Sequence, residues 1–162
     1  MKIALAQLNC HIGNFTGNTI LIKRKIDEAR NLGAQLVVFP ELALSGYPPL
    51  DFLEFNHFTK KCSDAIDEIA NSCTDIDVII GSPSKNPVKE GKNLFNSAFF
   101  ITKGKVARVI HKSLLPTYDI FDEYRYFEPN KKYETIVSNG VKIALTICED
   151  LWNEEDDPMY VT

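Results

Sequence analysis

Three residues carry side chains that together can break an amide bond: Cys148, Glu41 and Lys112. A thiolate is a strong nucleophile, but a free cysteine has a pKa of about 8.5 and needs a base or a nearby cation. A glutamate can take the thiol proton and later give it to the leaving amine. A lysine adds positive charge that favours the thiolate, and it can donate a hydrogen bond to an oxyanion. These residue types predict thiol-based acyl transfer if the three side chains meet.

Each of the three residues follows an expected strand. Glu41 comes after 36–40, Lys112 after 105–111 and Cys148 after 141–147. Ligand sites in open α/β sheets lie outside the carboxyl ends of strands. Each residue alone has an ordinary explanation, as an exposed carboxylate, a solvated lysine or an inert core thiol. The hypothesis of an active site therefore depends on finding all three at equivalent strand ends.

Two helices are expected to cover the sheet that carries these residues. Apolar positions at helical spacing predict a helix over 18–32, with Asn18 as N-cap and Gly33 just past its end. The second helix has a single apolar stripe that includes Cys62 and Cys73. These two cysteines are therefore predicted to be core residues without a chemical role.

The remaining pattern predicts a mixed sheet. Strands are expected over 2–9, 36–39, 78–81, 94–102, 105–110, 134–137 and 141–147. The first run is almost continuously apolar, which suits a central strand buried on both faces. Ser138-Asn139-Gly140 lies between the last two strands and is a strong type I′ hairpin signal. Alternating strands and helices followed by hairpins indicate an α/β domain.

Composition excludes several classes of protein. The 162 residues are 44% apolar and 25% charged, which suits one globular core. The net charge is −4 without a basic cluster, so we expect no nucleic-acid partner. No signal pattern or membrane-spanning stretch is visible, so we expect a cytoplasmic protein with reduced thiols and no membrane partner. The spacing of the three histidines and four cysteines predicts no metal site.

Three short segments resemble, in the same order, the motifs of the nitrilase (carbon-nitrogen hydrolase) superfamily. They are Val38-Phe39-Pro40-Glu41, His111-Lys112-Ser113-Leu114-Leu115-Pro116 and Leu145-Thr146-Ile147-Cys148-Glu149-Asp150. The resemblance implies that Glu41, Lys112 and Cys148 form that family's catalytic triad. It also implies an αββα sandwich with mixed sheets. Because the chain ends fourteen residues after Cys148, residues 1–162 are expected to hold only the front portion of this hydrolase domain.

Longer stretches are similar to the glutaminase domains of glutamine-dependent NAD⁺ synthetases. These stretches are 43–51, 118–127 and 148–152. The resemblance implies hydrolysis of L-glutamine to glutamate and ammonia through a cysteine thioester, without a cofactor for that step. The ammonia then passes through a tunnel to a synthetase domain, outside this chain, that uses ATP and Mg²⁺ to convert deamido-NAD⁺ into NAD⁺. A homo-oligomer is also implied, and the present residues alone are expected to be inactive.

The same resemblance assigns further residues to the site. Tyr118, Phe121, Glu149 and Trp152 fall where the family lines its glutamine pocket, and Glu149 suits the α-ammonium of the substrate. Ordinary packing explains the three aromatic residues equally well. Glu123 is a candidate for the additional glutamate that many superfamily members place near the lysine, although Asp122 or an exposed position for Glu123 would also fit. His111 is expected to be structural, because neighbours on a strand point to opposite faces.

Two alternatives to a glutaminase remain open. One is a free-standing amidase of the superfamily, such as an ω-amidase or carbamoylase. The other is an inactive binding module made from a truncated hydrolase, in which Cys148 has no special reactivity.

Overall fold

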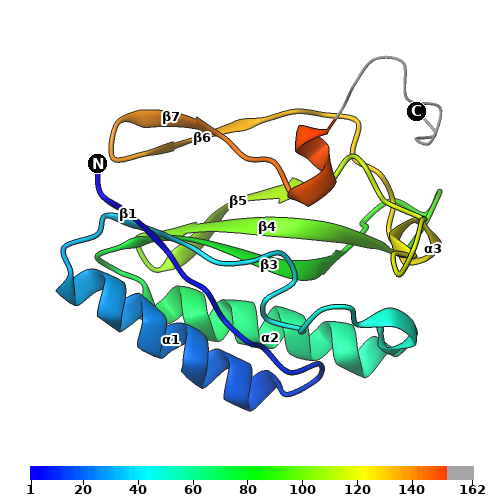
Figure 1. The fold of residues 1–162 in the computed structure, drawn as a ribbon, viewed down its shortest axis with the longest axis horizontal. Coiled ribbons are helices and arrows are strands. Elements are labelled where there is room, and N and C mark those ends of the chain that lie inside the picture. The colour runs from blue at the N-terminus through cyan, green and yellow to red at the C-terminus, as the bar shows by residue number, and fades with distance from the viewer. Residues whose placement is uncertain (153–162) are drawn as a thin grey trace.

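The computed structural model describes residues 1–152 and arranges them in three layers (Figure 1). Helices α1 (Phe15–Asn31) and α2 (Asn56–Ser72) lie on one face of a five-stranded sheet. A two-stranded hairpin lies on the other face. The expected α/β class with a mixed sheet is confirmed. Three layers of the αββα sandwich are present, and the described residues provide no second helical layer.

The five-stranded sheet determines where the candidate residues lie. Its order is β1 (Ile3–Leu5), β2 (Leu36–Val38), β3 (Asp77–Lys85), β4 (Leu94–Thr102) and β5 (Lys105–His111). The first three strands are parallel, and β4 and β5 form an antiparallel hairpin on β3. Strand β5 therefore runs in the same direction as β2 and β3. The carboxyl ends of β2 and β5 therefore lie at the same end of the sheet. Glu41 and Lys112 follow these two strand ends.

The prediction of a central first strand buried on both faces is wrong. Strand β1 is three residues long, pairs only with β2, and lies at the edge of the sheet. Ala4 packs toward the helices, whereas Ile3 and Leu5 point to the other face and Leu5 is 75% exposed. An apolar run predicts a buried strand only where other elements cover both faces. Within residues 1–152 the outer face of β1 is largely uncovered.

The predicted start of the first helix is also wrong. Asn14 caps α1, because its side chain accepts a hydrogen bond from the Gly17 amide at 3.1 Å. Asn18 is instead buried inside the helix, and its amide donates to the carbonyls of His11 and Leu44. The predicted residue just past the end, Gly33, is confirmed by its φ of +73°.

Two apolar clusters hold the layers together. The first fills the space between the helices and the sheet and includes Cys73, as the apolar stripe of α2 predicted. Cys62 is also fully buried, in a third cluster that includes Phe58 and Phe127. The second cluster lies between the sheet and the hairpin and contains Leu36, Ile79, Ala98, Phe100, Ile110, Ile136 and Ile147. Burying one such side chain stabilises the fold by about 1.5–3 kcal/mol. The segment that leads to Cys148 is thereby anchored on the sheet.

The hairpin and three short helices complete the described structure. Strands β6 (Thr135–Ser138) and β7 (Val141–Ala144) are joined at Asn139 and Gly140, which both have positive φ, so the predicted type I′ hairpin is confirmed. The short helices are η1 (Leu50–Glu54), α3 (Glu123–Tyr126) and η2 (Cys148–Leu151). In the described part of the chain, every helix is too short or too polar to cross a bilayer.

Candidate active site

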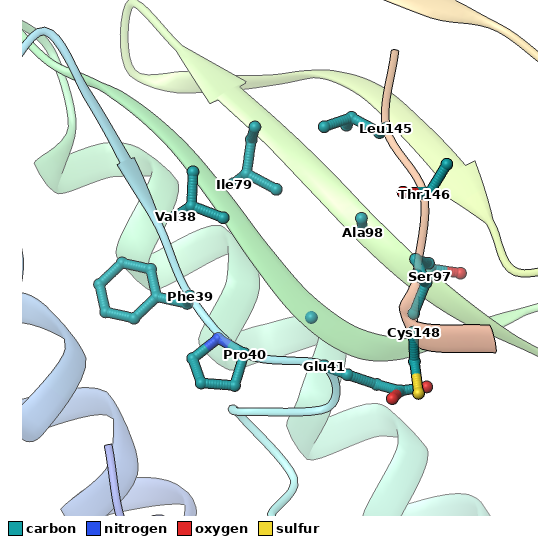
Figure 2. Close-up of a pocket in the computed structure, with 12 residues that line it drawn as sticks. Val38, Phe39, Pro40, Glu41, Ile79, Ser97, Ala98, Leu145, Thr146 and Cys148 are labelled. Atoms are coloured by element: carbon teal, nitrogen blue, oxygen red, sulfur yellow. The ribbon is translucent and has the colours of Figure 1, made fainter. Parts of the chain in front are cut away.

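The structure brings Glu41, Lys112 and Cys148 to one place. The Lys112 Nζ lies 2.7 Å from Glu41 Oε1, although the two residues come from loops after different strands. Figure 2 shows the Cys148 sulfur next to the Glu41 carboxylate. A carboxylate that a cation holds in place therefore lies near a thiol, which is an arrangement suited to proton transfer from sulfur to a base.

Lys112 is fully buried and is held by two carboxylates. Besides Glu41, it donates to Glu123 Oε2 at 2.8 Å. Burial alone would lower the pKa of Lys112, but the charges of Glu41 and Glu123 outweigh it and raise the pKa above its ordinary value. The ammonium therefore stays charged inside the protein, where its electrostatic effect is larger than at the surface.

Glu123 reaches the site from the short helix α3. Its side chain is buried, and Tyr47 donates a hydrogen bond from its hydroxyl to Glu123 Oε1 at 3.1 Å. Burial and the nearby Glu41 raise the pKa of Glu123, although Lys112 and Tyr47 act in the opposite direction. Of the positions considered for this segment, the structure thus places Glu123 beside Lys112, whereas Asp122 is exposed.

Cys148 is presented by a hydrogen-bonded turn. It begins η2 with a φ of +49°, a left-handed conformation that costs a non-glycine residue on the order of 1 kcal/mol. The carboxylate of Asp150 holds this turn by accepting hydrogen bonds from the amides of Ile147 at 3.0 Å and of Ser113 and Leu114 at 2.9 Å. Asp150 therefore joins the turn of the thiol to the loop that follows Lys112.

Lys112 favours the thiolate, as expected, but the net effect of the site on the Cys148 thiol is the opposite. Burial is the largest cause that raises the pKa of Cys148 above its ordinary value, and the charge of Glu41 raises it further. Lys112 lowers this pKa, but it is outweighed because its charge is already paired with two carboxylates. Chemistry at Cys148 therefore requires a proton acceptor, and Glu41 is next to it.

A cavity of about 120 Å³ extends from Glu41 and Cys148 between the sheet and the segment 145–148 (Figure 2). Apolar side chains from both layers form its walls, including Val38, Ile79, Ala98 and Leu145. Gly81 is needed at its floor, since a Cβ there would lie 2.3 Å from the backbone nitrogen of Leu42. The glycine allows the Glu41 loop to pack directly on β3.

Three of the four residues expected to bind substrate lie close to one another. Tyr118 donates a hydrogen bond to Glu149 Oε1 at 2.7 Å, and its ring meets Phe121 edge to face at 5.5 Å. Glu149 is buried, whereas Trp152 is 66% exposed. The described walls of the cavity in Figure 2 include none of these four residues. The structure thus assembles Tyr118, Phe121 and Glu149 close to one another and leaves Trp152 at the surface.

Sequence reasoning missed three residues that organise the site: Asn96, Tyr47 and Asp150. Asn96 donates to Glu41 and Glu123, and its amide stands out in the sequence within a largely apolar strand. Tyr47 and Asp150 lie within longer motifs and have no distinguishing local signal. Their contacts reach residues 76 and 37 positions away in the chain, which no local pattern predicts.

Other polar groups near the site fit a structural reading. His111 stacks on Phe95, and its Nδ1 lies 2.8 Å from the Ser97 hydroxyl. Burial lowers the pKa of this imidazole. Among residues 1–152, no group of three or more histidine, cysteine, aspartate or glutamate side chains is placed to hold a metal ion. The four cysteines are free thiols.

Comparison with known proteins agrees with this geometry. Residues 2–156 match the model of the carbon-nitrogen hydrolase family. A glutamine-dependent NAD⁺ synthetase from Synechocystis sp. is 43% identical over 157 residues, and one from Aquifex aeolicus is 40% identical over 152 residues. Each match covers 94% of this chain but only 28% and 26% of the respective relative. The chain thus spans little more than a quarter of the length of these relatives.

Comparison with solved structures also finds a glutamine-dependent NAD⁺ synthetase among the similar proteins. The glutamine-dependent NAD⁺ synthetase from Acinetobacter baumannii superimposes with a TM-score of 0.85 at 34% identity, over 93% of this chain and 28% of that one. An amidase from Nesterenkonia sp. shares the fold, with a TM-score of 0.76 at 24% identity over 93% of this chain and 56% of that one. The family match covers nearly the whole chain and includes the loops that carry Glu41, Lys112 and Cys148. This chain belongs to the carbon-nitrogen hydrolase family.

Proposed function

We propose that this chain hydrolyses L-glutamine to glutamate and ammonia through a thioester on Cys148. We further propose that the intact protein uses the ammonia to convert deamido-NAD⁺ into NAD⁺. The observation that carries the proposal is a cavity that Glu41 and Cys148 both line, with Lys112 bound to Glu41, in a chain about 40% identical to glutamine-dependent NAD⁺ synthetases.

The first chemical step begins from a protonated thiol. Glu41 takes the proton from Cys148 as the sulfur forms a bond to the carboxamide carbon of glutamine. One oxygen of Glu41 accepts hydrogen bonds from Lys112 and Asn96, and the other has no hydrogen-bond partner within residues 1–152. That second oxygen is suited to receive the proton.

Lys112 stabilises the charge that develops on the carbonyl oxygen. Two of its three N–H groups donate to Glu41 and Glu123, which leaves the third for the oxyanion. Loss of one such donor typically costs about 3 kcal/mol of transition-state stabilisation. Glu41 then gives its proton to the amide nitrogen as the C–N bond breaks, so that ammonia leaves and the thioester remains.

Water completes the reaction. Glu41, again ionised, takes a proton from a water molecule that attacks the thioester carbonyl carbon, and the C–S bond then breaks. The proton returns to sulfur, and glutamate leaves with the enzyme restored. In this scheme Glu149 receives the α-ammonium of glutamine, while Tyr118, Phe121 and Trp152 form walls that exclude water. The proximity of Tyr118, Phe121 and Glu149 supports this part of the proposal.

The ammonia-consuming step is proposed to take place in a separate synthetase domain that uses ATP and Mg²⁺. The chain covers only 28% of the Synechocystis relative, so such a domain would lie outside these residues. Side chains alone carry out the hydrolysis as written, and no step in it is assigned to a metal. A homo-oligomeric, cytoplasmic enzyme remains part of the proposal, on the basis of resemblance.

The test uses the intact protein and the variant Cys148→Ala. NAD⁺ formation from deamido-NAD⁺ and ATP is measured with glutamine or with ammonium as nitrogen source. We expect the variant to lose glutamine-driven synthesis and to keep ammonium-driven synthesis. Cys10→Ala is the matched control, because Cys10 is another free, partly exposed thiol outside the proposed mechanism.

Each other outcome selects an alternative. Amide hydrolysis by the wild type without NAD⁺ formation from either nitrogen source favours a free-standing amidase. Unchanged glutamine use in Cys148→Ala removes the thioester mechanism. A wild type that hydrolyses no amide and makes NAD⁺ only from ammonium favours an inactive module.

A further inference from the structure

We propose, building on the glutaminase function above, that Asn96 is a positioning residue that orients Glu41 as the proton acceptor for Cys148. Asn96 lies on β4 and is almost fully buried. It touches no reacting atom in the proposed mechanism. Its effect on the reaction therefore passes through the two carboxylates that it contacts.

Asn96 and Lys112 donate to the same two oxygen atoms. The Nδ2 of Asn96 lies 2.6 Å from Glu41 Oε1 and 3.3 Å from Glu123 Oε2. The Nζ of Lys112 lies 2.7 and 2.8 Å from these same atoms. One neutral donor and one cation thus bridge both carboxylates. Without Asn96, Glu41 would keep only its contact with Lys112 and would be free to turn about it, whereas Glu123 would still be held by Lys112 and Tyr47.

Asn96 holds the two carboxylates from the sheet, whereas the carboxylates themselves come from a loop and a short helix. Glu41 lies in the loop after β2, and Glu123 lies in a helix of four residues. Asn96 instead belongs to a nine-residue strand paired on both sides, and its carbonyl accepts the Lys112 backbone amide at 2.8 Å. Asn96 therefore fixes the start of the Lys112 side chain and the carboxylates at its end.

The orientation of Glu41 follows from this arrangement. Since Oε1 accepts from both Asn96 and Lys112, the other oxygen is the one left for a further partner. Figure 2 shows the Glu41 carboxylate directly beside the sulfur of Cys148. A general base acts only when its free oxygen is within hydrogen-bond reach of the proton. Asn96 determines which Glu41 oxygen is free.

A neutral amide suits this place better than a carboxylate or an apolar group. The Oδ1 of Asn96 is buried and has no hydrogen-bond partner within residues 1–152, which is unfavourable for folding. Turning the amide over would direct Oδ1 at two carboxylates, so the donor side must face them. An aspartate would place a third carboxylate against Glu41, and one of the pair would have to bind a proton.

The test compares Asn96→Asp and Asn96→Ala with the wild type in the intact protein. The kcat and KM for glutamine are measured across pH, together with ammonium-driven NAD⁺ synthesis. We expect Asn96→Asp to move the acid limb of the kcat profile up by about one pH unit or more, because the shared proton blocks Glu41. We expect Asn96→Ala to lower kcat about 10- to 100-fold, with little change in KM. Asn86→Asp is the control, since the Asn86 amide binds the Lys92 carbonyl outside the site.

Ammonium-driven synthesis reports whether each variant is folded. If Asn96→Asp fails to fold, Asn96→Ala still tests the kcat loss. The inference is overturned if the folded variants keep the wild-type kcat and acid limb, or if the loss appears in KM alone. It is also overturned if glutamine- and ammonium-driven synthesis fall together in both variants. These outcomes differ from failure of the glutaminase proposal, in which Cys148→Ala itself keeps glutamine use.

Discussion

Replacing Lys112 by methionine removes a buried cation and leaves Glu41 and Glu123 facing each other. The lost contacts are 2.7 and 2.8 Å long. At an effective dielectric constant of about 20, each corresponds to a gross attraction of roughly 6 kcal/mol. Most of this only offsets the cost of removing three charges from water. Breaking a buried ion pair on one side typically costs about 3–5 kcal/mol, and we expect Lys112→Met to lower the free energy of unfolding by that amount.

Unfolding of the part of the chain that contains Lys112 can be followed within the intact protein. Cys62 and Cys73 are fully buried, so brief alkylation in rising urea, read by mass spectrometry, reports when their surroundings unfold. With an m-value of about 2 kcal/mol/M, the expected loss moves the urea midpoint down by about 2 M. Lys105→Met is the control, because Lys105 is exposed on β5, the strand that Lys112 follows.

The charge explanation also predicts how the loss depends on other groups. Adding Glu123→Gln to Lys112→Met should recover more than about 1 kcal/mol, since it removes the repulsion between the carboxylates. The loss should shrink as the pH falls, because the raised pKa of Glu123 allows it to bind a proton early. A midpoint shift as small as that of Lys105→Met, or no recovery in the double variant, would refute the reasoning.

Two further predictions concern the thiol and its turn. In Glu41→Gln, alkylation of Cys148 at pH 8–9 should be faster than in the wild type, because a charge that raises the pKa of the thiol is gone. Glutamine hydrolysis should nevertheless fall by about 100-fold or more, because the base is lost, and slower alkylation would contradict this account. Asp150→Ala removes the acceptor of three backbone amides and should cost about 2–4 kcal/mol in the urea assay, with a parallel loss of glutaminase activity. Asp64→Ala, on the exposed face of α2, should change neither, and an equal effect of both substitutions would remove Asp150 from the site.

Short sequence patterns correctly predicted those elements that depend only on residues close together in the chain. The stripe on α2, the turn at Asn139-Gly140 and the glycine after α1 are all visible within a few residues of sequence. The wrong predictions share a different cause. The burial of β1 depends on what covers it, and the choice of Asn14 over Asn18 as N-cap depends on carbonyls that a distant loop presents to Asn18.

The residue types of the site and their order along the chain could also be predicted from the sequence. Glu41, Lys112 and Cys148 were identified by their chemistry and by their expected places after strands, and the structure brings them together. The expected strand 141–147 is shorter than predicted, because β7 ends at Ala144 in the separate hairpin and Cys148 instead begins η2. The groups that hold these three side chains in place could not be predicted from the local sequence. The contact of Asn96 with Glu41 joins residues 55 positions apart, and it exists only because β4 pairs with β3, on which the Glu41 loop packs.

The sequence by itself determined which reactive groups this protein has and which family it belongs to, and it indicated the two long helices and the main strands. These properties depend on side-chain chemistry and on periodicity along a short stretch of chain. Only the tertiary structure decided the charge state of the groups. The neighbouring carboxylates keep Lys112 charged against the effect of burial, whereas burial and the charge of Glu41 raise the pKa of Cys148, in both cases through the distance between residues far apart in sequence. Electrostatic energy depends on that distance and on the exclusion of water, and folding alone sets both.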